Sequence, residues 1–493
     1  MRLWIGLHLP NLPLEVFTSS CSEAAGCVVL EQERVLAVSE LAAKAGIRPG
    51  MRRSAALMLM PDASIYDRSH SREAEALQAV AMALLQYTPL VTQAEESTLL
   101  LDIGASLRLF GGIRRLCERV RRDLRVLGFT ASLSCAPTAR GAWLLARAGA
   151  GRSLKMDRLH QRLNALPCLL LPPTRPFATW LDGIGCHTIG ELRRLPRPGL
   201  QRRCGRALLD MVDSAFGMNP ELFEWIEPPT TFAAKLELFD RIENAELLLS
   251  GAQRLIVQMT GWLCARQLGA EQVTLFLEHE RGKTARPPTP VEISLSEPTW
   301  QGEHLVRLLR ERLSKLVLDA PVIGIALEAV KVHPITPPSE DLFPEPGGGA
   351  EDQAKMLEVL VARLGANNVL QAAPRADYRP EEANNWVSIE EKVREGVRAA
   401  QMPPDGQDLL RPSWLLAKPI PLLMRDHRPW YTSPLRMVSG PERVEAGWWD
   451  SGQVRDYFIA EGEDHVLYWL YLERIIGEDG VAEPKWFLHG LFG

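Results

Sequence analysis

The chain has 493 residues, enough for several domains of about 100–200 residues each. Its 46% hydrophobic and 24% charged residues are typical of a globular protein and argue against a largely disordered chain. No stretch approaches the roughly 18 uncharged apolar residues of a membrane helix, and the short apolar start differs from a secretory signal. We therefore expect a cytoplasmic protein with no membrane partner.

The eight cysteines include no Cys-x-x-Cys pair, so we expect neither a zinc site nor a disulfide framework, but mostly buried thiols. The net charge of −5 is unevenly distributed along the chain. Residues 336–400 carry −5 and residues 440–483 carry −8, which leaves +8 for the remainder. This division is consistent with phosphate contact in the basic part and protein contact in the acidic parts.

Two predicted strands carry the most informative pattern. The first covers residues 1–8 and leads into a short helix ending at Glu15; the second, residues 97–104, leads into Leu107-Arg108-Leu109-Phe110-Gly111-Gly112. Together they resemble the active-site strands of the Y-family, the translesion DNA polymerases. The prolines before Glu15 most resemble the non-catalytic branch of that family, which belongs to a bacterial mutagenesis complex.

The resemblance implies three metal-binding carboxylates, and alignment on Asp102 and Glu15 places Gly6, Ser97 and Thr98 at their positions. Two Mg²⁺ ions need hard, charged oxygen ligands, whereas glycine has no side chain and hydroxyl groups are neutral. His8, at a further acidic position of the family, suits zinc or copper better than magnesium. We therefore expect no catalytic residue, no metal and no cofactor.

An active low-fidelity polymerase with a rearranged metal site of Glu95, Glu96 and Asp102 is the alternative. Asp102 lies four residues beyond Thr98 on the same strand, roughly 13 Å away at about 3.3 Å per residue. The two glutamates would need a register shift, and a slip of one residue would turn the apolar side chains of the strand to the opposite face.

Residues 40–51 are similar to the small fingers domain of the family. The aromatic residue and the arginine that hold the incoming triphosphate in active members align with Glu40 and Ala43. A carboxylate repels phosphate, and the missing guanidinium removes a bidentate clamp. We expect weak or absent nucleotide binding, although Lys44 supplies one nearby cation.

Residues 181–192 resemble a helix-hairpin-helix, a motif that contacts the DNA backbone without reading bases. Its Gly-Ile-Gly turn lets the backbone approach a phosphate closely, and Thr188 with Glu191 forms a potential capping box. A packing turn without DNA contact is the alternative. A further arginine cluster between Arg108 and Arg125 fits a solvated helix face equally well. The predicted DNA-binding residues are Gly183, Ile184, Gly185, Thr188, Arg193, Arg194, Arg202 and Arg203.

From Phe232 to Val332 the pattern predicts strand, helix, strand, strand, helix and strand. The family resemblance implies a little-finger domain here, which tracks the duplex backbone. A linker rich in Pro, Gly and acidic residues follows, and within it Ser339, Glu340, Asp341, Leu342 and Phe343 resemble the linear motif that binds the sliding clamp (beta subunit). Ser339 departs from the usual glutamine of that motif.

A helix is predicted over residues 354–364, where leucine and valine residues fall on one face. The last 80 or so residues hold six of the 13 tryptophans and a strong strand signal at 466–471, which predicts a small β-rich module. The aromatic residues could form its core or bind a partner.

The predicted fold class is α+β multidomain, with the right-hand architecture of a Y-family polymerase plus the C-terminal module. The resemblance implies a non-catalytic, nucleoid-associated adaptor for translesion synthesis and damage-induced (SOS) mutagenesis. Its expected partners are primer–template DNA, the sliding clamp, a RecA-like accessory protein, an error-prone polymerase and, as a further candidate, RecA. The predicted domains are 1–20 with 75–165 (palm), 21–74 (fingers), 166–228 (thumb), 229–335 (little finger), 336–410 (linker with clamp motif and helix) and 411–493 (partner-binding module).

Overall fold

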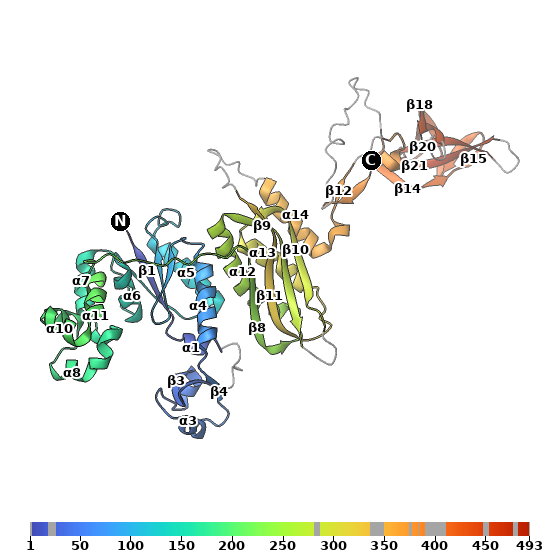
Figure 1. Ribbon diagram of the computed structural model, residues 1–493. Coiled ribbons are helices and arrows are strands. Elements are labelled where there is room, and N and C mark those ends of the chain that lie inside the picture. Colours follow the sequence, from blue (N-terminus) through green and yellow to red (C-terminus); the bar gives the residue numbers. More distant parts are fainter. Residues whose placement is uncertain are drawn as a thin grey trace. The chain divides into compact units, whose positions relative to one another are not determined.

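The computed structural model describes residues 2–17, 26–280, 286–335, 350–373, 377–383, 385–389, 411–446, 453–476 and 482–492. The chain forms two compact units, Met1–Arg363 and Leu364–Gly493 (Figure 1). The first mixes helices and sheets and the second is rich in strands, which confirms the predicted α+β multidomain class. Within the described ranges, no helix is both long enough and apolar enough to cross a membrane.

A four-stranded antiparallel sheet, in the order β5-β6-β1-β7, lies at the centre of the first unit. Successive residues of a strand point to opposite faces, so Ile5 and Leu7 face one side and Trp4 and Gly6 face the other. The strands are β1 (Trp4–His8), β5 (Val91–Ala94), β6 (Thr98–Asp102) and β7 (Ser132–Ala136).

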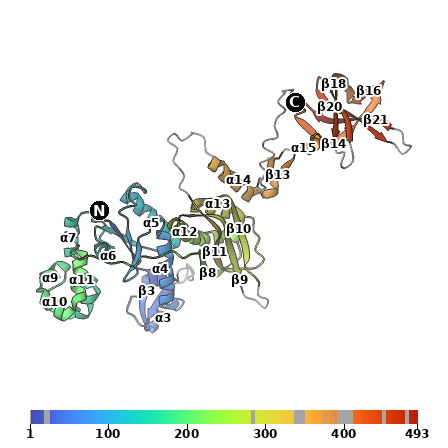
Figure 2. The same ribbon diagram turned by 45° about the horizontal axis from the view of Figure 1, so that its top comes forward.

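Helices cover both faces of this central sheet (Figures 1 and 2). Ile5 and Leu7 belong to the apolar core that includes residues of α4 and α5, whereas Trp4 belongs to the core that includes residues of α6. The two faces of the sheet therefore pack against two different apolar cores. The helices are α1 (Leu12–Glu15), α4 (His70–Leu84), α5 (Ile113–Leu127) and α6 (Ala139–Arg147).

Between β1 and α4 the chain forms a small layer with its own core, which includes Val28, Leu30 and Ile47. Its sheet has the order β3-β2-β4, and β2 pairs with β3 through a tight turn at Gln32 and Glu33. Both turn residues have positive φ, 50° and 62°, as a two-residue type I′ hairpin requires. The elements are β2 (Cys27–Glu31), β3 (Arg34–Val38), α2 (Glu40–Lys44), α3 (Arg53–Leu59) and β4 (Ser64–Asp67).

A bundle of short helices follows α6 and shares its core, because Leu163, Leu181, Leu192 and Leu208 pack in the same apolar cluster as Trp143. The predicted helix-hairpin-helix is formed by α8 and α9. The elements are α7 (Met156–Ala165), η2 (Cys168–Leu170), η3 (Pro172–Phe177), α8 (Ala178–Gly183), α9 (Ile189–Arg194), α10 (Arg197–Cys204) and α11 (Arg206–Ala215).

The next body has the predicted order of strand, helix, strand, strand, helix and strand, which confirms the expected order of elements. Its antiparallel sheet has the order β10-β9-β11-β8, and Leu275 and Ile325 pack in the same core as Leu255 of α12 and Leu309 of α13. The elements are β8 (Ala233–Ile242), η4 (Ala245–Leu247), α12 (Leu248–Arg266), β9 (Leu268–His279), β10 (Thr289–Thr299), α13 (Gly302–Leu313) and β11 (Val322–Pro334).

Helix α14 (Ala350–Leu364) confirms the helix predicted for this region and docks on the preceding body. The carboxylate of Glu358 accepts hydrogen bonds from the backbone N–H of Ser296 and from the His304 ring, both at 2.6 Å. Val361 and Ala362 are buried. The helix after the linker is therefore fixed to the body that precedes the linker.

The second unit confirms the predicted β-rich module. A five-stranded sheet of order β14-β21-β20-β19-β18 encloses two apolar clusters, and Tyr457 and Trp469 stack at 4.1 Å between ring centres in one of them. The aromatic residues do not all lie in this core, because Trp414 is 70% exposed. The elements are η5 (Ala366–Asn368), β12 (Leu370–Ala372), α15 (Pro380–Ala383), β13 (Trp386–Ser388), β14 (Trp414–Pro421), β15 (Leu423–Arg425), β16 (Arg428–Tyr431), β17 (Ser433–Pro434), β18 (Arg436–Ala446), β19 (Gln453–Glu461), β20 (Leu467–Ile476) and β21 (Ala482–Leu491).

Seven of the eight cysteines lie in the described part of the chain, and no disulfide joins any two of these seven. Six of them are buried, as expected for structural thiols in a core. The eighth, Cys21, lies outside the described residues.

Candidate functional site

The two strands that resemble a polymerase active site are direct neighbours. In the antiparallel register of β1 and β6, His8 pairs with Thr98, Gly6 with Leu100 and Trp4 with Asp102. Ser97 lies in the turn before β6 with φ of 51°. The structure thus brings His8 and Thr98 together at one end of the strand pair, and it places Asp102 at the other end.

The volume beside Gly6 is filled by the backbone of α6. A Cβ atom at Gly6 would lie 2.3 Å from the carbonyl oxygen of Ala142 and 3.1 Å from the amide nitrogen of Trp143. Real Cβ atoms do not approach backbone atoms so closely, so every side chain is excluded here unless the helix moves. The same carbonyl accepts a hydrogen bond from the Ser134 hydroxyl at 2.7 Å, which holds it against the sheet.

His8 is tied to the turn that precedes β6. Its Nδ1 lies 3.0 Å from the carbonyl oxygen of Glu96 and 3.2 Å from the Thr98 hydroxyl, which itself donates to the Glu96 carbonyl at 2.9 Å. Burial, with the nearby Arg147 guanidinium, lowers the pKa of His8 below its ordinary value of 6.5. His8 therefore resists protonation and serves as a neutral hydrogen-bonding group.

The lowered pKa of His8 gives a pH-dependent prediction. A histidine with a depressed folded-state pKa stabilises the fold fully above its unfolded pKa, and this contribution falls as the pH drops below about 6.5. We expect His8→Gln to reduce the loss of stability between pH 7.5 and pH 5.5, measured by thermal unfolding of the full chain. The exposed His427→Gln is the matched control. Equal pH slopes for His8→Gln and the wild type would contradict the assignment.

The two glutamates of the alternative metal site are held by arginines. The carboxylate of Glu95 lies 2.6 Å from Arg140 Nη1, and Glu96 pairs with Arg147 and, at 2.5 Å, with Arg175 Nη1. Arg147 is nearly buried, with 7% of its side chain exposed. We call this set, Glu95, Glu96, Arg140, Arg147 and Arg175, the arginine–glutamate cluster.

Trp143 fills the centre of this cluster. Its indole N–H donates to the Glu95 carbonyl at 3.0 Å, and the guanidinium carbons of Arg140 and Arg147 lie 5.0 and 4.5 Å from the centre of its ring. The sequence analysis did not predict that residues of α6 contact Glu95 and Glu96. The available signal was the spacing of Arg140, Trp143 and Arg147, which places all three on one side of α6.

Asp102 is separate from the arginine–glutamate cluster. Its Oδ1 accepts a hydrogen bond from the Gly104 N–H at 3.1 Å, and Arg2 lies 3.7 Å from its other oxygen. Within the described residues, no three His, Cys, Asp or Glu side chains form a group that could hold a metal ion. The acids that remain near this strand pair are thus each engaged with protein groups.

In the fingers-like layer, Glu40 and Lys44 neutralise each other through an ion pair of 2.8 Å across one helical turn. The hydrogen bond from Lys44 lowers the pKa of Glu40. The cation that the sequence offered for triphosphate binding therefore already has a carboxylate partner.

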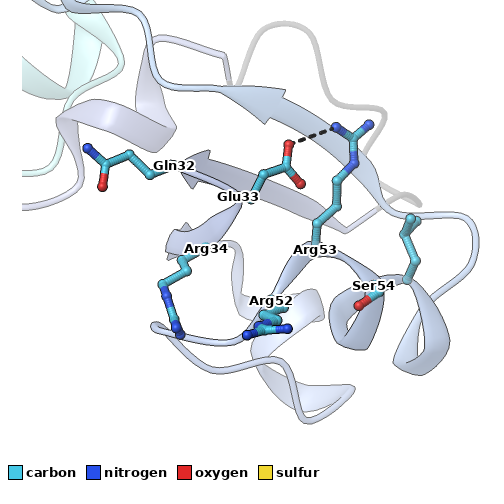
Figure 3. Close-up of a pocket in the computed structure, with 7 residues that line it drawn as sticks. Gln32, Glu33, Arg34, Arg52, Arg53 and Ser54 are labelled. Carbon is cyan, nitrogen blue, oxygen red and sulfur yellow. Dashed lines mark ion pairs between the residues drawn. The ribbon is translucent and has the colours of Figure 1, made fainter.

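Sequence reasoning also missed an open pocket of about 560 Å³ in this layer (Figure 3). Glu33 and Arg53 form an ion pair of 3.7 Å, and Arg34 donates to the Gly50 carbonyl at 2.9 Å. Three guanidinium groups against one carboxylate leave the pocket with a net positive charge. Its lining residues are Gln32, Glu33, Arg34, Arg52, Arg53, Ser54 and Leu57.

The helix-hairpin-helix has the geometry that its sequence predicts. Gly185 adopts φ of 68°, and a Cβ at Gly183 or Gly185 would meet no atom within 4 Å, so the turn is open to a ligand. Thr188 accepts a hydrogen bond from the Glu191 N–H at 3.2 Å, and the Glu191 carboxylate accepts from the Thr188 N–H at 2.9 Å. This reciprocal pair confirms the predicted capping box.

The four predicted DNA-binding arginines are all exposed, and the structure places them on α9 and α10. Arg193 lies over the Phe216 ring at 3.7 Å, and Arg203 lies over Trp180 at 4.5 Å. Arg202 donates to the Pro198 carbonyl at 3.3 Å. These contacts orient three of the four arginines without neutralising their charge. Ile184, at the tip of the turn, is 47% exposed.

The outward face of the little-finger-like sheet is acidic. Glu328 of β11 pairs with Thr274 of β9, which also pairs with Glu292 of β10, so the two glutamates lie on one row. Two rows along the same face, Glu237 and Glu278 flank Gly324. Lys235, which pairs with Ala326 on the row between them, forms an ion pair of 2.7 Å with Glu278. This face offers little to a phosphate backbone.

The predicted clamp-binding residues Ser339, Glu340, Asp341, Leu342 and Phe343 lie outside the described residues. The described chain reaches Ile335, whose N–H donates to the Gln267 carbonyl at 3.1 Å, and resumes at α14.

Comparison with known proteins gives concordant matches. A family model described as the impB/mucB/samB family matches residues 13–147. Protein ImuB of Caulobacter vibrioides (strain NA1000 / CB15N) is 26% identical over 470 residues, which span 91% of this chain and 100% of that protein; the ImuB of a second strain gives the same values. DNA polymerase IV of Shewanella woodyi is 25% identical over 179 residues, 35% of this chain and 49% of that protein.

Among solved structures, a ternary complex of Dbh has a TM-score of 0.39 at 14% identity and covers 66% of this chain and 98% of that chain. The insertion ternary complex of Dbh DNA polymerase has a TM-score of 0.38, also at 14% identity, with the same coverage.

Proposed function

We propose that this chain, which is similar to protein ImuB and to the impB/mucB/samB family, is a non-catalytic adaptor for translesion synthesis and damage-induced mutagenesis. In this role it binds primer–template DNA and the sliding clamp and recruits an error-prone polymerase. The observation that carries the proposal is the packing at Gly6, where the Ala142 carbonyl occupies the place that a side chain would need.

Primer extension tests the non-catalytic role directly. We expect the purified full chain to add no nucleotide to a primer–template with Mg²⁺ or with Mn²⁺, because the nearby acids are paired with arginines or with backbone amides. DNA polymerase IV of Shewanella woodyi serves as the positive control. Template-dependent extension that is lost in Glu96→Gln would instead support the rearranged metal site.

DNA contact is assigned to the thumb-like bundle, since its open glycine turn and exposed arginines fit a phosphate backbone. We expect the double variant Arg194→Gln, Arg202→Gln to bind DNA at least about fivefold more weakly than the wild type. The slope of log K against log salt should decrease in magnitude by about 2. Fluorescence anisotropy with a labelled primer–template measures both quantities.

The control for this prediction is Arg425→Gln with Arg428→Gln, two exposed arginines of the second unit. Equal losses of DNA affinity in the two double variants would show a general effect of charge and would contradict the assignment of DNA contact to the thumb-like bundle.

Clamp binding is assigned to residues 339–343, where Leu342 and Phe343 would fill an apolar pocket of the clamp. We expect Leu342→Ala with Phe343→Ala to abolish capture of the chain by immobilised clamp. Leu222→Ala, which removes a leucine that is 99% exposed, should leave capture intact. If immobilised clamp captures the double variant as well as the wild type, residues 339–343 do not bind the clamp.

Partner binding is assigned to the second unit. Trp414 and Leu423 are 70% and 66% exposed, and apolar side chains of this size at a surface are typical of protein contact. The proposed partners are an ImuA-type RecA-like protein and an ImuC-type error-prone polymerase, with RecA as a further candidate. Co-purification of each candidate with the full chain and with its Trp414→Ser, Leu423→Ser variant tests the assignment.

A further inference from the structure

Helix α5 presents an outer face of arginines that the proposed function does not use. Its buried side includes Leu116, Val120 and Leu124, and the opposite side is exposed. Arg114, Arg121 and Arg125 follow one another at intervals of seven and four residues, which places them in one row about 16 Å long. A second row beside the first holds Arg115, Arg119 and Arg122.

Few carboxylates oppose this charge. Arg122 is paired, with Asp123 at 3.4 Å and with Glu303 at 3.3 Å. Asp123 is buried, where it accepts a hydrogen bond from Tyr87. Glu118 is the one exposed acid on the helix, and among the described residues neither it nor Arg114, Arg121 or Arg125 belongs to an ion pair of 4 Å or less.

Arg125 lies in the last turn, where the helix dipole favours a cation, but most of the other arginines are placed unfavourably for the helix. Arg121 and Arg125 are like charges one turn apart, and so are Arg115 and Arg119, which is unfavourable for an isolated helix. Arg114 lies in the first turn, where the helix dipole favours acidic residues, and no acidic residue is present there. Glu118, one turn from Arg114 and from Arg122, offsets part of this repulsion, and an external anion would offset the rest.

The composition of the face favours nucleic acid over protein. Protein interfaces have an apolar or aromatic centre, whereas protein–DNA interfaces are polar and strongly positive. Along the two arginine rows no exposed apolar side chain interrupts the charge; Leu109, 81% exposed, lies before the helix begins. A duplex offers about five phosphates per strand over 16 Å, enough to meet each arginine of the first row.

We propose that the outer face of α5 is a second contact surface for the phosphodiester backbone of DNA, separate from the thumb-like bundle. α5 packs on the face of the central sheet that bears Ile5 and Leu7, whereas the bundle shares the core on the opposite face with Trp4 and Trp143 (Figure 1). A duplex that contacts the glycine turn would therefore have to pass around the sheet to contact α5 as well. The proposal rests on the proposed function in one respect only, namely that DNA is a ligand.

The test uses three full-chain variants and anisotropy titrations with a duplex and with a single strand. The first variant is Arg114→Gln, Arg121→Gln, Arg125→Gln; the second replaces the same residues with lysine. The third, Lys418→Gln, Arg425→Gln, Arg428→Gln, makes an equal change of charge in the second unit. Because all of these side chains are exposed, circular dichroism and thermal unfolding should match the wild type.

We expect the first variant to bind duplex at least about fivefold more weakly than the wild type. The slope of log K against log salt should decrease in magnitude by about 2 to 3. The lysine variant should retain most of the affinity, and the third variant should change little. A loss confined to the single strand would assign the surface to unpaired DNA. Unchanged affinity in the first variant, or equal losses in the first and third, would overturn the proposal.

The outcomes also separate the two proposals. If the thumb variant weakens binding and the α5 variant does not, the inference fails and the proposed function stands. If the wild type binds neither DNA form, both fail.

Discussion

Replacement of Gly6 with aspartate is expected to destabilise the first unit by at least about 3 kcal/mol. The new Cβ would lie 2.3 Å from the Ala142 carbonyl, so α6 would have to move away from β1. Overpacking of this kind typically costs about 1–3 kcal/mol, and a buried carboxylate beside a carbonyl oxygen adds repulsion and desolvation. Urea unfolding of the full chain, combined with hydrogen exchange of the amides in β1 and β7, measures the effect.

The matched comparison is Gly6→Ala against Gly199→Ala. A Cβ at Gly199 meets no atom within 4 Å, so that change should be neutral or slightly stabilising in its helix. A Gly6→Asp protein as stable as the wild type would contradict the packing described at this position. It would also reopen the space for a metal ligand, which makes the experiment informative about function as well as stability.

Replacement of Arg147 with alanine is the second change with a large expected effect, about 3 kcal/mol. The side chain is 7% exposed, pairs with Glu96, donates to the Leu170 carbonyl and lies over the Trp143 ring. Removal of Arg147 leaves Glu96 with only the half-exposed Arg175 as a cation, and it leaves the Leu170 carbonyl without its donor. Loss of a partner from a largely buried ion pair is more costly than loss of the attraction alone.

Arg175→Ala is the control, because Arg175 pairs with the same glutamate but is 47% exposed and should contribute about 1 kcal/mol or less. A double-mutant cycle of Arg147→Ala with Glu96→Gln gives the coupling energy of the pair. A coupling near zero would mean that Arg147 stabilises the fold only through its contacts with Trp143 and Leu170.

Local features were predictable from the sequence. Thr188 and Glu191 are three residues apart, and the capping box they form depends on little else. The order of strands and helices from Phe232 onwards followed from periodicity, since each element buries one face. The helix before Gly365 was predicted in the same way, although its docking through Glu358 was not.

The contacts that define the candidate site were not predictable. The sequence identified Gly6 as a residue without a ligand atom, but only the packing of α6 shows that no side chain fits there. Glu95 and Glu96 read as free acids in the sequence, and their arginine partners lie far along the chain in α6 and η3. Alternation in the little-finger-like strands was visible, yet the acidic character of one face required the register of four strands.

The docking of α14 has a further consequence for the segment between Ile335 and Ala350. Glu358 and the buried Val361 and Ala362 fix the far end of that segment to the same body from which it leaves. A partner bound between Ile335 and α14 is therefore tethered to this body at two points. Undocking of α14 would leave the attachment at Ile335 alone.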